Sequence, residues 1–208
     1  RTPINENFDA EIWGAELEAV WEPVPGLRFN FSGGAQDSSL GDGSKSIDLM
    51  DRTDGNPNYL TVKPFPVLPS NCVVAKSDVE ALIASNRAAN GGQPGNDIGN
   101  VYTLCPGFIF SAPPGTYDTP NQGQGFYKDL SGKELPNTPH FTVSFGGQYA
   151  FPLSENWGAL LRTDVYWQSN SWARVYNDRP YDVLHGWSNM NLTVDLIHND
   201  GLQIEAYI

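Results

Sequence analysis

The chain has little positive charge, and it lacks any long apolar run. Only 12 Lys and Arg residues stand against 24 Asp and Glu residues among 208, which gives a formal net charge of -12. Because no basic stripe is present to displace the counterions around a polyanion, we exclude a nucleic-acid partner. No run of about 18 apolar residues occurs, so no segment of the sequence predicts a transmembrane helix.

Cysteine and histidine are also scarce, and their positions exclude the common metal and catalytic sites. Cys72 and Cys105 are the only cysteines, and no His or second Cys pair lies at zinc-site spacing. His140, His185 and His198 fall in separate expected loops or turns, without a nucleophile partner. We therefore expect no metal, no cofactor and no enzymatic activity.

Glycine, proline and aromatic residues are abundant, and six stretches alternate apolar with polar residues. The 21 Gly, 16 Pro and 12% aromatic residues favour strands and loops over helices. In residues 13–21 the odd positions are Trp, Ala, Leu, Ala and Trp, and Glu16 and Glu18 lie between them. Because side chains alternate across a strand, such a strand has one apolar and one polar face.

The same alternation returns in residues 27–35, 141–151, 159–167, 190–196 and 202–208. The apolar phase contains no charged residue, whereas the opposite phase holds polar and charged residues, as a wet lumen requires. These polar-phase residues are Glu16, Glu18, Arg28, Asn30, Arg162, Asp164, Asn189, Asn191, Asp195, Gln203 and Glu205.

The length and spacing of the stretches favour a membrane β-barrel over an ordinary half-buried sheet. Four of them reach the 9 to 11 residues, roughly, of a tilted membrane strand, against about 5 to 6 for soluble strands. The links alternate short and long, and Trp21, Phe151 and Trp157 flank short turns, where aromatic rings occupy a headgroup belt. The predicted fold is all-β, an antiparallel transmembrane β-barrel fragment of about six strands with periplasmic short turns.

Six strands are too few to close a barrel, because the smallest bacterial barrels have about 8. The sequence also begins at Arg1 without an initiator Met or signal peptide, and stops within the alternation at Ile208. We expect residues 1–208 to be part of a larger outer-membrane β-barrel, whose remaining strands pair with these.

Residues 36–138 form a long insertion, which we expect to be an extracellular loop with its own organisation. Ser77 and Glu80 match a capping box before an apolar run, which predicts a helix over residues 78–89 that stops at Asn90-Gly91-Gly92. Cys72 and Cys105 flank this helix. In an exported protein they predict a disulfide; in a reducing compartment they would be two buried thiols.

Several phrases resemble barrel strands of TonB-dependent outer-membrane receptors. They are residues 9–23, 135–142, 162–169, 176–178, 189–192 and 200–202. The resemblance covers the strands, roughly half of the chain, and leaves the long insertion unmatched. The resemblance implies a barrel of about 22 strands with a plugged lumen. In the order of the parent chain, these six strands would come shortly before the end of the barrel. The chain carries no plug domain, energy-coupling box or terminal aromatic strand of its own.

The resemblance implies that the parent protein imports a scarce ligand, such as a ferric siderophore or another nutrient, across the bacterial outer membrane. Its implied partners are outer-membrane lipid, the plug domain and remaining strands of the same chain, the TonB complex and the small-molecule ligand. Two alternatives stay open: a soluble exported glycan-binding β-sandwich, and a passive porin-type barrel.

The best ligand-binding candidates crowd one loop at the outer strand ends. They are Trp172, Arg174, Tyr176, Asp178, Arg179, Tyr181 and Trp187. Aromatic rings with Arg can bind an anionic iron chelate by charge and stacking, or with Asp and Asn can grip a sugar ring. The structural alternative is an aromatic girdle and a loop-packing cluster.

Overall fold

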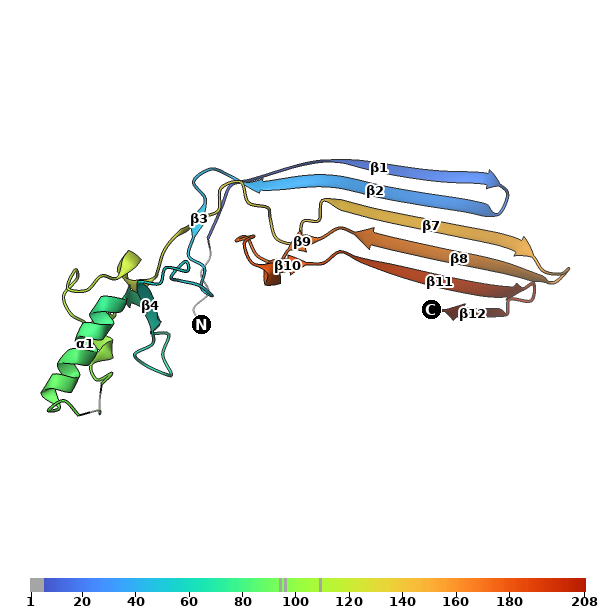
Figure 1. Cartoon of the computed structure of the whole chain (residues 1–208). Coiled ribbons are helices and arrows are strands. Elements are labelled where there is room, and N and C mark those ends of the chain that lie inside the picture. The colour runs from blue at the N-terminus through green and yellow to red at the C-terminus, as the bar shows by residue number, and fades with distance from the viewer. Residues whose placement is uncertain (1–5, 94, 96, 109) are drawn as a thin grey trace. The chain divides into compact units, whose positions relative to one another are not determined.

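The computed structural model describes residues 6–93, 95, 97–108 and 110–208. The chain divides into two compact units. The sheet unit is Phe8–Asp42 with Ser131–Ile208, and the insertion unit is Gly43–Leu130 with the described residues that precede Phe8. Each unit is described below by itself (Figure 1).

The sheet unit is built on six antiparallel strands in the order β1-β2-β7-β8-β11-β12 (Figure 1). The strands are β1 Ala10–Val24, β2 Leu27–Leu40, β7 Phe141–Pro152, β8 Trp157–Gln168, β11 Trp187–His198 and β12 Gln203–Tyr207. The predicted large antiparallel sheet is confirmed, and five strands are longer than the stretches of alternation. The sheet is open: β1 and β12 are its two edges, and these strands alone close no barrel.

The strands follow one another along the chain, and their links alternate as predicted. Short turns join β1 to β2, β7 to β8 and β11 to β12, all at one end of the sheet, and the long links lie at the other end (Figure 1). The first turn needs Gly26, whose φ is 85°. A Cβ there would also collide with the carbonyl oxygen of Ala150 on β7, so only glycine fits.

The strand register places the whole apolar phase on one face of the sheet. Phe145 pairs with Phe31 on one side and with Val165 on the other, and Val165 pairs in turn with Met190. Directly paired residues share a face. We call this surface the apolar face; Leu161 is 44% exposed on it and Met190 62%.

The opposite surface, the polar face, carries the other phase. Ser144 pairs with Ser32 and Tyr166, and Tyr166 pairs with Asn189. On the same face Asp164 pairs with Asn191. Within the stretches of alternation the register therefore gives the sheet one mainly apolar and one mainly polar face. A slip of one residue in a strand would move its apolar side chains to the polar face.

The insertion unit contains a short helix and small two-stranded sheets. Its elements are β3 Lys45–Ser46, β4 Tyr59–Val62, β5 Cys72–Ala75, α1 Lys76–Ala89, η1 Val101–Leu104, η2 Pro120–Gly123 and β6 Lys128–Asp129, with β3 paired to β6 and β4 to β5. Its core is small, and its fully buried side chains are Val73, Val74, Leu104, Cys105 and Leu130.

The predicted disulfide is confirmed: Cys72 and Cys105 are bonded, with their Cα atoms 5.7 Å apart. The bond ties β5 to the residue that follows η1. Cys72 precedes α1 and Cys105 follows it, so the bond links the two chain segments on either side of the helix. Both cysteines are buried.

The predicted helix is present, but its start was wrong. Helix α1 begins at Lys76, and its N-cap residue, Ala75, makes no side-chain capping bond. Ser77 lies inside the first turn, so it cannot cap it, and Glu80 instead faces Lys76 at 3.8 Å. The predicted stop is confirmed, because the helix ends at Ala89 and Gly91 has a φ of 64°.

The insertion is also shorter than residues 36–138. β2 continues to Leu40, whose backbone nitrogen donates to Lys133 O and whose carbonyl accepts from Gly132 N, both at 2.9 Å. Leu135 N donates to the hydroxyl of Ser38. Residues 36–40 and 131–138 therefore belong to the sheet unit.

None of the helices in the described part of the chain is both long and apolar enough to cross a membrane.

Candidate ligand site at the outer end of the sheet

The link between β8 and β11 is an ordered loop in the sheet unit. It contains β9 Ser171–Trp172, η3 Pro180–Asp182 and β10 Val183–Leu184, and β9 pairs with β10. Residues just before β7 hold it in place. Lys133 Nζ donates to Tyr176 O at 2.6 Å, and Asn137 N donates to Trp172 O at 2.8 Å.

Arg174 organises the centre of this loop. Its guanidinium donates to both carboxylate oxygens of Asp182, at 2.7 and 2.8 Å, and Asp182 is buried. The rings of Tyr176 and Tyr181 lie 5.1 and 5.9 Å from the guanidinium carbon. This bidentate pair with two flanking rings satisfies the fork of Arg174 within the protein, as the loop-packing alternative expects.

The seven predicted ligand residues lie in this loop and at the start of β11. Arg174, Tyr176 and Tyr181 come together around Asp182, and Asp178 lies beside Arg179 with 4.0 Å between Oδ1 and Nε. Trp172 pairs with Val183 in the small sheet. Trp187 lies at the start of β11 and lines a pocket.

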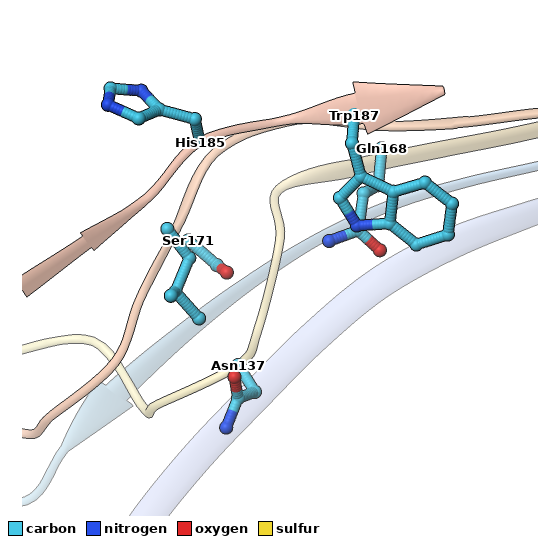
Figure 2. Close-up of a pocket in the computed structure, with 6 residues that line it drawn as sticks. Asn137, Gln168, Ser171, His185 and Trp187 are labelled. Carbon is cyan, nitrogen blue, oxygen red and sulfur yellow. The ribbon is translucent and has the colours of Figure 1, made fainter. Parts of the chain in front are cut away.

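The pocket has a volume of about 410 Å³, within the range of small-molecule sites. It is lined by Asn137, Gln168, Ser171, Leu184, His185 and Trp187 (Figure 2). Gln168 pairs directly with both Trp187 and Thr142, so these three residues lie at the end of the polar face away from the short turns. In Figure 2 the ring of His185 points away from the other labelled side chains.

Tyr166 contacts two of the lining residues, Gln168 and Trp187. The hydroxyl of Tyr166 donates to Gln168 Oε1 at 3.0 Å, which orients the carboxamide. The ring of Tyr166 also packs against Trp187, with 5.1 Å between centroids and 47° between planes. Trp187 is 50% exposed. Its indole therefore packs against Tyr166 on one side and is open to solvent on another.

Sequence reasoning missed five of the six lining residues. Gln168 and Asn137 lie within the family-like phrases, and the polar alternation reaches Gln168, so that residue had a signal. Ser171 and Leu184 pair with each other only because the loop turns back on itself. His185 was interpreted as a turn residue, and no local pattern distinguishes a pocket-lining turn residue from any other.

Charge on the polar face is mainly acidic. Arg162 pairs with Asp164 at 2.7 Å, and Arg28 lies 3.6 Å from Glu22. The polar phase of the six strands contains no other Lys or Arg, but it contains four further acids, Glu16, Glu18, Asp195 and Glu205. This surface therefore has a negative balance, which disfavours an anion.

We expect Gly186→Ala to deform the pocket. A Cβ at residue 186 would lie 2.5 Å from Gln168 O, and Gly186 N also donates to Asn170 Oδ1 at 2.6 Å. Backbone atoms would have to move, so the free energy of unfolding should fall by about 1 to 3 kcal/mol. The measurement is a urea titration of the folded protein.

Gly158→Ala is the matched control for this substitution, because the nearest atom to its Cβ, Ile197 O, is 4.0 Å away. Gly158 lies in the adjoining strand β8. Equal effects of the two substitutions would show that the loop ends do not approach as closely as described.

No group of three or more His, Cys, Asp and Glu side chains in the described ranges could hold a metal ion. Comparison of the chain with known protein families, curated proteins and solved structures finds no match.

Proposed function

We propose that the chain is part of an outer-membrane β-barrel receptor that imports a scarce small-molecule ligand, with energy supplied by the TonB complex. The observation that carries the proposal is the division of the six strands into one apolar and one polar face. Five strands have 12 or more residues, which exceeds the length of about 9 to 11 needed to cross a bilayer. The apolar face would meet lipid and the polar face a wet lumen.

Aromatic rings on the apolar face support this orientation. Near the short turns, Trp21 stacks with Phe29 at 5.9 Å and Tyr149 with Phe151 at 5.0 Å between centroids. Near the other strand ends, Trp167 lies on the same face and pairs with Val143. Aromatic girdles at both interfaces are typical of outer-membrane barrels.

The open edges β1 and β12 favour a longer barrel. Unpaired backbone groups in lipid cost several kcal/mol each, so only closed barrels and helices span membranes. The proposal gives these edges partners, namely the remaining strands of the parent chain. The resemblance adds a plug domain and the TonB complex as further partners, an outer-membrane location with the insertion unit outside, and periplasmic short turns.

The exposed apolar face also bears on the alternatives. A soluble glycan-binding sandwich would cover that face with a second sheet, whereas its residues are exposed in the described structure, Met190 among them. A passive porin would share the barrel, so the two readings differ in whether the parent protein carries a plug domain.

The test combines membrane location with removal of the insertion unit. We expect the intact protein to be extracted from outer membranes only by detergent and to migrate differently after heating. Replacing Gly43–Leu130 by a short flexible linker should keep this heat-dependent migration of the folded protein. The backbone hydrogen bonds of Leu40 to Gly132 and Lys133 lie outside the replaced segment. Uptake of a radiolabelled nutrient should fall, because folded loops contribute ligand contacts.

Three outcomes contradict parts of this proposal. Protein that is released from cells without detergent would overturn the membrane assignment. Unchanged uptake after the deletion would remove the insertion unit from the import mechanism, and loss of the heat-dependent migration would show that the sheet depends on residues within 43–130.

A further inference from the structure

We infer that the pocket lined by Trp187 and Gln168 binds a neutral, polyhydroxylated ring, that is, a sugar unit of an oligosaccharide; as a substrate assignment this rests on the proposed function. The ligand class follows from the shape and chemistry of the lining residues. Neither an anionic chelate nor a purely apolar ligand matches them.

The indole of Trp187 supplies the stacking surface. It is half exposed and packs against Tyr166 on one side, so a ring-shaped ligand can lie on the open part. Aromatic faces carry negative potential, which attracts the weakly positive C–H groups on the apolar side of a sugar. Leu184 is a second apolar side chain in the lining.

The polar lining groups match hydroxyls rather than charges. The carboxamides of Asn137 and Gln168 and the hydroxyl of Ser171 each can donate and accept hydrogen bonds, as sugar hydroxyls do. The hydroxyl of Tyr166 donates a hydrogen bond to Gln168 Oε1, which leaves the amide NH2 group of Gln168 to donate to a ligand oxygen. His185 points its ring away from this group (Figure 2).

Charge argues against an anionic ligand. The guanidinium of Arg174, in the same loop, donates to both carboxylate oxygens of Asp182, and Arg174 is not among the residues that line the pocket. The polar face that continues from the pocket carries Glu16, Glu18, Asp195 and Glu205 beyond its two ion pairs. An anion would therefore meet repulsion along this surface, whereas a neutral sugar would not.

The experiment is isothermal titration calorimetry of the intact protein in detergent. The neutral probes are short oligosaccharides of glucose, xylose and galactose, and the anionic probes are oligogalacturonate and a ferric tris-catecholate. We expect a neutral probe to bind. Trp187→Ala should weaken that binding roughly tenfold or more, and Gln168→Leu roughly threefold to tenfold.

Gln148→Leu is the matched control, because it makes the same change on the same face. Gln148 lies on β7 six residues from Thr142, the partner of Gln168, and hence roughly 20 Å from the pocket. It should bind the probe like the unsubstituted protein. Heat-modifiable migration of all variants checks that a loss of binding is not a loss of folding.

The outcomes separate this inference from the proposed function. Binding of an anionic probe alone, binding of no probe, or equal losses in Gln148→Leu and Gln168→Leu would overturn the sugar inference while an outer-membrane location still stands. Sugar binding by protein that needs no detergent would keep the inference and overturn the import role.

Discussion

Phe145→Arg is expected to lower the free energy of unfolding in lipid by about 2 to 4 kcal/mol, the cost of a cation near the bilayer midplane on a lipid face. Phe145 lies within β7 and is flanked by Phe31 and Val165 on neighbouring strands. The guanidinium would therefore have no water or polar side chain beside it on that face. Urea unfolding in lipid vesicles, followed by tryptophan fluorescence, measures the change.

Ser144→Arg is the control, because residue 144 adjoins Phe145 at nearly the same depth and faces the other way. Its partners are Ser32 and Tyr166 on the polar face. We expect little loss of stability, since the new side chain would point into water. If both substitutions destabilise the protein equally, the apolar face does not contact lipid.

The second large effect concerns the disulfide. Replacing both Cys72 and Cys105 by Ser should destabilise the insertion unit by about 4 kcal/mol, because the bond closes a long loop, with a sequence separation of 33. The core of this unit is small, so the crosslink supplies a large share of its stability. The six-stranded sheet should be unaffected, because the bond lies wholly within the other unit.

Limited proteolysis checks this result, because cleavage should increase within residues 43–130 and not in the strands of the sheet unit. Reducing agent should reproduce the effect in the unsubstituted protein and add nothing in the double variant. Equal protection of that unit with and without the bond would show that its core suffices alone.

The sheet was largely predictable because its signal is local and repeated. A residue such as Glu16 between Ala15 and Leu17 fixes which way a strand faces, and the same alternation recurs in each strand. Strand ends were not predictable in this way. β1 begins at Ala10, which pairs with Leu40, because backbone pairing continues after the alternation has ended.

The helix start and the pocket depend on contacts that local patterns do not encode. Lys76 N donates to Asn58 O, so a distant loop sets where α1 begins and Ser77 loses its capping role. In the pocket, Ser171 meets Leu184 by β9–β10 pairing, and Asn137 joins them from the segment before β7. Only Trp187 and Gln168 come from strands of the six-stranded sheet, where alternation operates.

The two ends of the insertion unit lie close together, and this affects how strands β2 and β7 of the sheet find each other during folding. β2 must find β7 across a gap such as that between Gln36 and Pro139, which are 103 residues apart. Within the insertion unit, Leu130 N donates to Ser44 O at 2.8 Å, so its two ends lie side by side.

Once that unit has folded, the chain that must still be closed into a loop falls to fewer than about twenty residues, which lowers the entropic cost of β2–β7 pairing by about 1.5 kcal/mol. Folding of the insertion unit thus also shortens the search for the longest-range strand pairing in the sheet.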